Sequence, residues 1–400
     1  MPDVASTGHL LYELATESAK RGMVVHVVTS FPSYGPPESW QACPKREIHQ
    51  GVRVHRLRTT RFTKDRILGR AMNSLTFLVP LFCRQLLTRS KNRVFLYTTN
   101  PPFLGIIGAI VSLLRPHRYV VLLHDSYPHL AVWSGKIRPN GFIERIWHFC
   151  NRLMYCRASQ TIVLCIKAKE LVCKVYGVDP SRVHVVHNWA DPMALFPINK
   201  EDSLFAKENG YDQTFTLLYS GNLGLYYEFE SLLQAADRLR NDSHIRFVFI
   251  GAGGRRKWLA NEIKSRDLTN TTLFPYQPFE GLNDSLNACD VSLVTISKGI
   301  EGISFPSKLY SSLAVGKPVI AISEDDSELK QMVEGSGSGI WCLLGDVDAL
   351  VKAIQRLQSD RNLQETMGRA ARVTMENHYT IGAATDDYLR IIQLAAERLH

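Results

Sequence analysis

The sequence predicts an α/β protein with two doubly wound domains, each a parallel sheet covered by helices on both faces. Short apolar runs rich in Val, Ile and Phe alternate with segments of helical period along most of the chain. Strands without polar–apolar alternation are typical of sheets buried on both faces. The runs form two series that separate near residues 190–213, and 400 residues are enough for two domains.

The first series contains six expected strands with helices between them. The strands are Met23–Thr29, Val52–Leu57, Val94–Thr98, Tyr119–Leu123, Thr161–Leu164 and Val183–Val186, and the clearest helices are Leu10–Lys20 and Phe142–Tyr155. A doubly wound domain starts with a strand, but this chain passes from Pro2-Asp3 directly into a helix. We therefore expect a central first strand to be missing, because the start is misassigned or the form is truncated.

The second series also contains six expected strands. They are Phe215–Ser220, Arg246–Ile250, Thr272–Phe274, Val291–Ile296, Pro318–Ile322 and Ile340–Leu343, with helices over Glu228–Leu239, Lys257–Ser265 and Ala349–Gln358. No strand follows the last helices, Asn362–Met375 and Ala383–His400, so we expect them to pack back across the first domain. The predicted division is 1–195, 196–376 and a returning helix over 377–400.

Composition limits the class of protein. With 45% hydrophobic and 21% charged residues, the chain is neither disordered nor a coiled coil. Its eight cysteines form no C-x-x-C pair, which predicts reduced, buried thiols in a cytoplasmic protein and neither a disulfide framework nor a zinc site. The start shows no signal peptide, and the longest apolar stretch, 103–114, is shorter than the roughly 20 residues of a spanning helix. We expect a soluble or peripheral protein.

The net charge of +9 is unevenly distributed. Residues 1–200 carry 27 Lys and Arg against 11 Asp and Glu, residues 201–400 carry 20 against 27, and residues 51–93 carry 11 against one. Such asymmetry favours an anionic surface or ligand for the first half, with a solvated basic face as the alternative. No zinc-finger or aromatic RNA-binding signature is present, so a bilayer surface or a phosphorylated substrate fits better than nucleic acid.

Glycine-rich turns follow two strands of the second series. Gly221-Asn222-Leu223-Gly224 follows Phe215–Ser220, and Gly251-Ala252-Gly253-Gly254 follows Arg246–Ile250. Glycines at the carboxyl ends of parallel strands let backbone amides approach a phosphate or a sugar; a plain tight turn is the alternative. Neither turn has the P-loop sequence or supports a dinucleotide fingerprint.

A stronger anion-site candidate is Phe305-Pro306-Ser307-Lys308-Leu309-Tyr310. Proline is favoured in a first helical turn, so Ser307 and Lys308 are expected at the amino end of a helix. Free N–H groups, the positive helix end and an ammonium together suit a diphosphate. A capped helix with a solvated lysine is the alternative.

A histidine and a carboxylate follow a strand of the first series. His124-Asp125-Ser126-Tyr127-Pro128 comes after Tyr119–Leu123, so His124 and Asp125 are expected to face the crevice between the domains. A packed histidine bonded to the backbone is the alternative. His184 and His187 are expected to be structural, and no acidic cluster ends a strand, so no metal site is predicted.

Together these motifs resemble the retaining nucleotide-sugar glycosyltransferases of family 4, in particular the polysaccharide-biosynthesis branch, whose members add sugars to lipid-linked glycans. The resemblance covers essentially the whole chain except the absent first strand. Besides the opening through Thr7-Gly8, the matching motifs are Asn100-Pro101-Pro102, His124-Asp125-x-x-Pro128, Asn188-Trp189, Tyr219-Ser220-Gly221-Asn222, Ile250-Gly251-x-Gly253 and Pro306-Ser307-Lys308-Leu309-Tyr310.

The resemblance implies a GT-B fold, with the donor nucleotide in the second domain, the acceptor in the first and the reaction in the cleft. It implies no metal or other cofactor, so fixed donors would neutralise the leaving diphosphate. These donors would be Lys308, Ser307 and amides of the loops that contain Gly221, Asn222, Gly251 and Gly253. The leaving phosphate oxygen would help to deprotonate the acceptor hydroxyl on the same face.

The same resemblance gives roles to further residues. His124, beside Asp125, would contact the donor sugar, and Glu301 would also reach that sugar. Tyr276-Gln277-Pro278 would hold the base, and Leu309 lies within the donor-binding motif. The acceptor side would include Thr7, Gly8 and Tyr127.

Two departures from the family pattern affect the expected donor. The family's second glutamate, which grips the ribose, corresponds to a position close to Ser311. A common Arg/Lys pair is replaced by Asn222 and Leu225–Tyr227. Arg255 or Arg256 is expected to supply the missing charge, and the donor identity stays open.

We therefore expect a transferase that uses a UDP-sugar. Its acceptor would be a lipid-linked glycan at the cytoplasmic membrane face, which suits the basic region 51–93 beside apolar Leu75–Cys83, or fructose 6-phosphate, because sucrose-phosphate synthases belong to the same family. Two other classes are considered. A GT-B epimerase needs cleft carboxylates on both sides, for which only Asp125 and Glu301 are available. A sugar-nucleotide-binding protein without transferase activity would fit the missing strand and Ser311.

Overall fold

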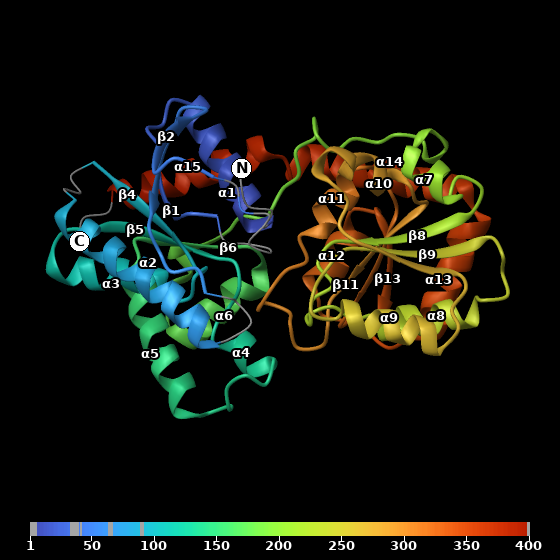
Figure 1. Ribbon diagram of the computed structural model, residues 1–400, viewed down its shortest axis with the longest axis horizontal. Helices are drawn as coiled ribbons and strands as arrows, with labels where there is room; N and C mark the ends of the chain where they lie inside the picture. The colour runs from blue at the N-terminus through green and yellow to red at the C-terminus, as the bar shows by residue number, and fades with distance from the viewer. Residues whose placement is uncertain (1–5, 33–39, 41, 63–66, 89–91, 398–400) are drawn as a thin grey trace.

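The computed structural model describes all residues except 1–5, 33–39, 41, 63–66, 89–91 and 398–400. The described chain forms two lobes side by side, the first with two sheets and the second with one, and helices pack against the sheets (Figure 1). The first half of the chain, blue to green, forms one lobe, and the second half, green to red, forms the other, except for the last helix, in red, which lies on the first lobe. The predicted α/β class with two sheet domains is therefore confirmed.

The strands of the first lobe belong to two sheets. β4 (Val94–Thr98), β5 (Arg118–Leu123), β6 (Gln160–Val163) and β7 (Val183–Val185) pair in parallel in that order. In the other sheet β3 (Val52–Leu57) lies between parallel β1 (His26–Ser30) and antiparallel β2 (Arg46–His49). β1 and β4 are thus edge strands of two different sheets. We predicted a single sheet for this lobe, and the structure has two. The predicted missing strand would precede Ser6, outside the described residues.

Helices cover both sheets of the first lobe. They are α1 (Ser6–Lys20), α2 (Ile67–Leu87), α3 (Leu104–Leu114), α4 (His129–Trp133), α5 (Phe142–Arg157) and α6 (Ile166–Tyr176). α2, α3 and α5 lie next to one another in the lower part of this lobe (Figure 1). The apolar stretch 103–114 forms α3, and no helix in the described part of the chain is long and apolar enough to cross a membrane.

The second lobe contains one six-stranded parallel sheet. Its order is β10-β9-β8-β11-β12-β13, with bounds Thr271–Phe274, Ile245–Ile250, Phe215–Ser220, Val291–Thr295, Val319–Ser323 and Gly339–Leu343. The chain moves outward in one direction from β8 and in the other from β11. Their boundary is therefore a topological switch point, where the loops after neighbouring strands diverge and open a crevice. The loop after β8 contains Gly221, and the loop after β11 leads into α11, which begins at Lys308.

The remaining helices pack around this sheet, except the last. They are α7 (Leu204–Asn209), α8 (Glu230–Arg238), α9 (Arg256–Ser265), α10 (Leu282–Asn287), α11 (Lys308–Ala314), α12 (Glu328–Gly335), α13 (Val347–Ser359), α14 (Arg361–His378) and α15 (Ile381–Glu397), with short 3-10 turns at η3 (Lys200–Asp202) and η4 (Phe279–Gly281). A further 3-10 turn, η2 (Pro180–Arg182), precedes β7 in the first lobe.

The chain crosses between the lobes twice, at adjacent places. The Ala190 amide donates to the Tyr379 carbonyl at 3.0 Å, and Ala190 also pairs with Thr380. Beyond this point α15 lies against α1 and β5 of the first lobe, where Tyr388 and Ile391 are fully buried. The predicted return of the C-terminal helix is confirmed. The expectation that the preceding helix also returns is wrong. This helix, α14, stays on the second lobe, where Arg372 donates to the Ala314 carbonyl of α11.

The cysteines differ partly from the prediction. All eight are free, but only Cys165, Cys289 and Cys342 are buried, and Cys83 is exposed on α2. The expectation of uniformly buried thiols is therefore wrong. α2 turns one face to solvent along its whole length, and Cys83 lies on that face.

Candidate active site between the lobes

The two glycine turns of the second lobe pack directly against each other. The Gly221 amide donates to the Ile250 carbonyl and the Leu223 amide to the Ala252 carbonyl, both at 2.9 Å. A Cβ at Gly251 would lie 1.9 Å from the Gly221 oxygen, and one at Gly253 would lie 2.4 Å from the Leu223 oxygen. Both residues have φ near +152°, so any side chain would break this contact. The turns form one backbone surface at the ends of β8 and β9.

Lys308 reaches this backbone surface from α11. Its side chain is 8% exposed, and its Cε would lie 3.4 Å from a Cβ at Gly221. The ammonium nitrogen lies 3.3 Å from the centroid of the Tyr227 ring and 4.6 Å from that of Tyr219. Burial holds the pKa of Lys308 well below its ordinary value. The arrangement is a cation cage that an incoming anion would complete.

The other residues of the predicted anion motif differ in their surroundings. Ser307 is the N-cap residue of α11, and its side chain makes no capping bond. The Ser311 hydroxyl donates to the Lys308 carbonyl at 2.9 Å. Leu309 is fully buried in the core, and its amide donates to the Pro306 carbonyl. α11 has only seven residues, so the charge of Lys308 contributes more to the site than the helix dipole does.

His124 and Asp125 lie at the end of β5, as their place in the sequence predicts. The His124 amide donates to the Thr99 hydroxyl at 3.2 Å, and its buried Nε2 has no hydrogen-bond partner in the described structure. Burial lowers the pKa of His124 to about 4, so the ring is neutral at physiological pH. Burial raises the pKa of Asp125, and a hydrogen bond with the Ser304 side chain of the second lobe acts in the opposite direction and lowers it.

Tyr227 connects these two halves of the site. Its ring lies under the Lys308 ammonium. Burial and then the nearby Asp125 carboxylate raise the pKa of its hydroxyl. Tyr227 therefore lies between the cation of the second lobe and the carboxylate of the first.

Further contacts hold the lobes together around this point. The Ser126 amide donates to the Ile303 carbonyl, and Trp133 Nε1 donates to the Lys298 carbonyl, both at 2.9 Å. The Trp133 ring also packs edge-on against Tyr226 at 6.1 Å. The segments after β5 and β11 are thus joined by hydrogen bonds.

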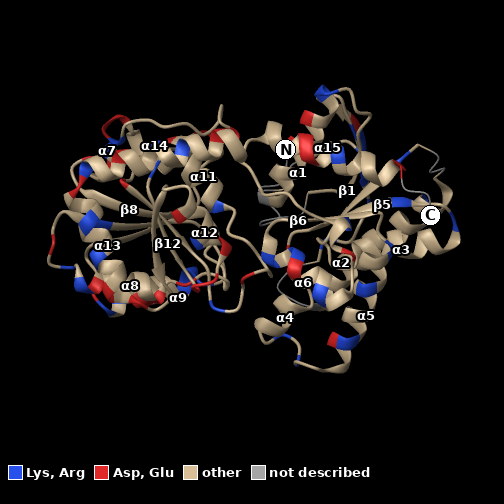
Figure 2. Ribbon diagram, turned by 180° about the vertical axis from the view of Figure 1, so that it is seen from behind, with Lys and Arg blue, Asp and Glu red and all other residues tan. Residues whose placement is uncertain are grey.

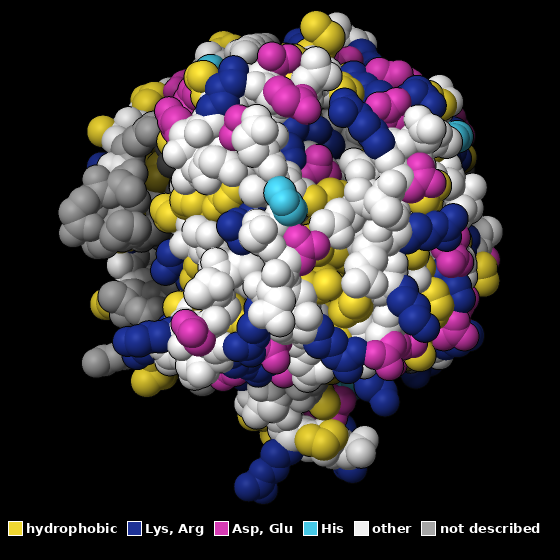
Figure 3. All heavy atoms as spheres, turned by 90° about the vertical axis from the view of Figure 1, so that its right-hand side faces the viewer, with side chains coloured by type: hydrophobic (Ala, Val, Ile, Leu, Met, Phe, Trp, Pro, Cys, Tyr) yellow, Lys and Arg dark blue, Asp and Glu magenta, His cyan; other side chains and the backbone are white. Residues whose placement is uncertain are grey.

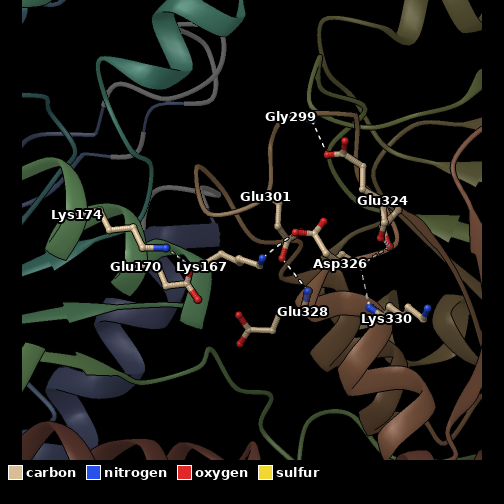
Figure 4. Close-up of polar contacts among 11 residues, drawn as sticks. Lys167, Glu170, Lys174, Gly299, Glu301, Glu324, Asp326, Glu328 and Lys330 are labelled. Carbon is tan, nitrogen blue, oxygen red and sulfur yellow. Dashed lines mark hydrogen bonds and ion pairs between the residues drawn. The ribbon is translucent and has the colours of Figure 1, made fainter.

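Glu301 lies in a cluster of acidic and basic side chains at the lobe interface (Figure 4). It accepts from the Glu328 amide at 2.8 Å, and its other oxygen is buried without a hydrogen-bond partner. Across the interface Lys167 pairs with Asp326 at 2.8 Å, and the Ile166 amide donates to Glu328 at 2.6 Å. Burial raises the pKa of Glu301 and raises that of Glu328 to about 7. The described contacts of Glu301 are with this cluster, and its predicted contact with a donor sugar stays a prediction.

The residues predicted to hold the nucleotide lie at the edge of the glycine turns. The Arg255 guanidinium stacks on the Trp258 ring at 4.5 Å, whereas Arg256 donates to the Gly251 carbonyl at 3.3 Å. Tyr276 is 54% exposed after β10, and the side-chain Nε2 of Gln277 donates to the Pro275 carbonyl. Arg255 is thus engaged by an aromatic ring, and Arg256 is the cation attached to the turns.

The predicted acceptor residues lie on the first lobe. The His9 ring stacks on Phe279 of the second lobe at 5.3 Å, which places the first turn of α1, with Thr7 and Gly8, beside η4. Tyr127 stacks on Trp147 at 5.4 Å and an interplanar angle of 5°. Together with Asp125 and Phe103 these two rings line a hollow of the first lobe.

The two histidines that were predicted to be structural are held by ordinary contacts. His184 Nε2 lies 2.9 Å from the Gln160 side-chain oxygen, and His187 Nδ1 lies 3.1 Å from the Leu164 carbonyl. In the described residues no group of three or more His, Cys, Asp or Glu side chains is placed to hold a metal ion. Chemically, the site offers a buried cation, a glycine-lined backbone surface, a neutral imidazole and a carboxylate with a raised pKa.

Two family models match the chain and together span most of it. The model described as "Glycosyl transferase 4-like domain" matches residues 7–189, and the one described as "Glycosyl transferases group 1" matches residues 200–374. The chain belongs to the group 1 glycosyltransferases. It is an enzyme of the glycosyltransferase class, as the resemblance predicted.

Curated relatives of this glycosyltransferase carry matching descriptions. A probable glycosyltransferase, WbjE of Pseudomonas aeruginosa, is 27% identical over 341 residues, which are 84% of this chain and 82% of that protein. WcaI of Escherichia coli K12, a putative colanic acid biosynthesis glycosyl transferase, is 33% identical over 184 residues, 45% of each chain.

Solved structures share the fold of this glycosyltransferase at low sequence identity. Sucrose-phosphate synthase of Thermosynechococcus elongatus aligns with a TM-score of 0.74 and 15% identity, over 97% of this chain and 93% of that one. HepE of Anabaena, solved in complex with UDP-glucose, aligns with a TM-score of 0.72 and 14% identity, over 97% and 96%. These alignments show the GT-B fold.

The analysis of the sequence did not find the aromatic part of this site. Tyr219 and Tyr227 form the Lys308 cage, and Trp133 and Tyr226 join the lobes. The available signal was the segment Leu225–Tyr227, where tyrosines stand in place of the family's basic pair. Glu328, Lys167 and Asp326 gave no signal, because they come from separate helices and loops.

Proposed function

We propose that this glycosyltransferase transfers a sugar from a UDP-sugar to the hydroxyl of a lipid-linked glycan in polysaccharide biosynthesis, with retention of configuration. The observation that carries the proposal is the buried Lys308 ammonium beside the paired glycine turns at the switch point of the second sheet. A buried cation next to glycine turns, where no side chain keeps a ligand away from the backbone, suits a leaving diphosphate.

The donor proposal has two supports. HepE, which shares the fold, was solved with UDP-glucose. In this chain the exposed Tyr276 and the neighbouring Gln277 follow β10, next to the glycine turn after β9. We expect this segment to hold the uracil ring and Ser311 to lie beside the ribose.

The proposed mechanism uses charges that are already in place. Lys308 and the amides of the turns would bind the diphosphate and stabilise the negative charge that grows as the glycosidic bond breaks. The neutral His124 would contact the donor sugar through its unpaired Nε2, with Asp125 beside it. The departing phosphate oxygen would take the proton of the acceptor hydroxyl on the same face of the sugar.

The acceptor proposal rests on the relatives and on the first lobe. WcaI is described as acting in colanic acid biosynthesis. Tyr127, which stacks on Trp147 and follows Asp125 by two residues, would contact the acceptor on the first-lobe side of the site. Fructose 6-phosphate is a second candidate, favoured by the basic excess of residues 1–200.

A donor-hydrolysis screen tests the proposal. The chain is mixed with a panel of nucleotide sugars, alone and with fructose 6-phosphate or a lipid-linked glycan, and the released nucleoside diphosphate is measured. We expect release from UDP-sugars, stimulated by the lipid-linked acceptor and absent in Lys308→Ala. UDP binding without turnover of any donor would indicate the binding protein, and stimulation by fructose 6-phosphate alone would indicate the second candidate.

A further inference from the structure

Three neighbouring helices of the first lobe expose a large apolar surface, here called the α2–α3–α5 face. Its apolar members are Leu68, Met72, Leu75, Val79 and Leu87 of α2, Ile110, Leu113 and Leu114 of α3, and Phe142, Ile143, Ile146 and Phe149 of α5. Their exposed fractions range from 38% to 85%. Large exposed apolar patches on a protein surface mark interaction sites.

The helices of this face are fixed to one another at their carboxyl ends. Arg115, which follows α3, donates to the carbonyls of Leu86 and Thr88 at the end of α2. Arg157 at the end of α5 donates to the Ser112 hydroxyl of α3 at 3.0 Å. α3 packs against both α2 and α5. The exposed side chains therefore belong to one rigid layer.

The layer is almost free of acidic residues. α2 and α3 contain none, and α5 contains only Glu144, whose side chain is 14% exposed. Glu144 accepts from the Asn140 amide and lies 3.5 Å from His148. In Figure 2 the first lobe carries more blue than red on these helices, and on the outer end of the second lobe in Figure 3 both signs are interspersed.

The clearest arrangement is on α5. At 3.6 residues per turn, Phe149, Phe142, Ile146 and Ile143 fall within an arc of about 120°. The exposed Arg145 and Arg152 border this arc on one side. An apolar aromatic ridge with a basic border is typical of helices that lie in a membrane interface.

We propose that the α2–α3–α5 face docks this chain on an anionic lipid bilayer. The apolar side chains would enter the headgroup boundary, and Arg145 and Arg152 would meet anionic lipid headgroups. A second copy of the chain fits less well, because a two-fold contact between two such faces would bring their arginines together with no acidic side chains to pair them. The inference holds for any donor sugar.

The position of the face also bears on the proposed acceptor. The inner side of α5 carries Trp147, which stacks on Tyr127, and Asn151, which donates to the Tyr127 carbonyl. Tyr127 follows Asp125 by two residues. Docking through α5 would therefore hold the acceptor side of the site near the bilayer; this step rests on the proposed function, and the docking itself does not.

Vesicle sedimentation of the full chain tests the docking. We expect binding to vesicles of phosphatidylglycerol and phosphatidylcholine, with weaker binding to phosphatidylcholine alone and at high salt, where the Debye length falls to about 3 Å. Arg145→Glu with Arg152→Glu should weaken binding to the anionic vesicles at least about tenfold, since each basic residue near such a surface contributes about fivefold. Phe142→Ser with Phe149→Ser should weaken binding to both kinds of vesicle.

Matched controls come from the second lobe. Lys257→Glu with Lys264→Glu reverses two exposed charges at the same spacing on α9, and Leu204→Ser with Val373→Ser removes two exposed apolar side chains. Both should bind vesicles like the wild type. The melting temperature shows that each variant is folded, and donor hydrolysis without vesicles reports on the site separately. The proposal would be overturned by equal losses of binding in the control pairs or by unchanged binding of the α5 variants. A wild-type dimer that dissociates in the Phe142→Ser/Phe149→Ser variant would also overturn it.

Discussion

The Lys308 ammonium nitrogen lies 3.3 Å from the centroid of the Tyr227 ring. This is well within the roughly 6 Å range of cation–π contacts, and such contacts contribute about 2 kcal/mol when desolvated. An aromatic face attracts the charge without neutralising it, so the buried lysine remains short of a counter-ion and its pKa is lowered by burial. A diphosphate would supply the missing negative charge.

Lys308→Ala should therefore lower kcat more than it raises the KM for the donor. The negative charge on the leaving diphosphate is larger in the transition state than in the bound donor, so the lost stabilisation is larger there, by roughly 3 kcal/mol. Steady-state kinetics with varied donor measures both constants.

Two further variants sharpen this test. Lys308→Arg should recover only part of kcat, because a planar guanidinium does not fill a site built for a point charge. Lys298→Ala removes an exposed lysine of the same lobe and should leave kcat unchanged. Wild-type kcat in Lys308→Ala would show that the diphosphate binds elsewhere.

Tyr227 should position Lys308 through its ring. Tyr227→Phe keeps the aromatic face and should keep most of kcat, whereas Tyr227→Leu should lower kcat by roughly tenfold, the loss expected for about 1.4 kcal/mol of cation–π attraction. Comparison of kcat and KM for both variants measures this. If Tyr227→Phe lowers kcat as much as Tyr227→Leu does, the hydroxyl near Asp125, and not the ring, is the group that matters for kcat.

The fold could be predicted from the sequence because its signals are local. The predicted strands are mostly apolar, and Tyr119–Leu123 is an uninterrupted apolar run, as expected for a strand buried on both faces. α2 was not predicted as a helix, because Pro80 lies inside it and its exposed face is apolar, which hides the helical period. β2 was missed because it is short and mostly exposed.

The site was only partly predictable. Lys308 and the glycine turns could be placed because the loops after neighbouring parallel strands meet at one edge of the sheet. The partners of Glu301 could not, because they come from α6, α12 and the loop before α12, and only tertiary packing brings them together. Likewise, nothing in the segment Leu225–Tyr227 shows that one of its rings will lie under Lys308.

His124→Ala should lower kcat on the order of 10²-fold, comparable to the loss of one positioned polar group. Because burial lowers the pKa of His124 to about 4, the imidazole is neutral across the working range. The kcat profile should then show no inflection from this ring near pH 6.5. His184→Ala, which removes a ring bonded to Gln160, should leave kcat near the wild-type value. An unchanged kcat in His124→Ala would make this histidine structural.

Glu328 should make the stability of the folded chain depend on pH. Burial raises its pKa from 4.5 to about 7, so the folded chain keeps a proton that the unfolded chain releases over this range. Stability from this group is therefore present at low pH and is lost as the pH rises from 4.5 to 7. His187, 3.7 Å from Glu328, has a pKa lowered by burial and acts in the opposite direction below pH 6.5.

Glu328→Gln isolates the contribution of this carboxyl, because the amide oxygen still accepts from the Ile166 amide while His187 is unchanged. The variant should match the wild type near pH 4.5 and be more stable at pH 7.5, by at most on the order of 3 kcal/mol. Thermal unfolding across this pH range measures the difference. Glu334→Gln, at an exposed position of the same helix, serves as the control and should follow the wild-type profile. A Glu328→Gln variant that loses stability at pH 7.5 would show that the ionised carboxylate, with Lys167 nearby, holds the lobes together.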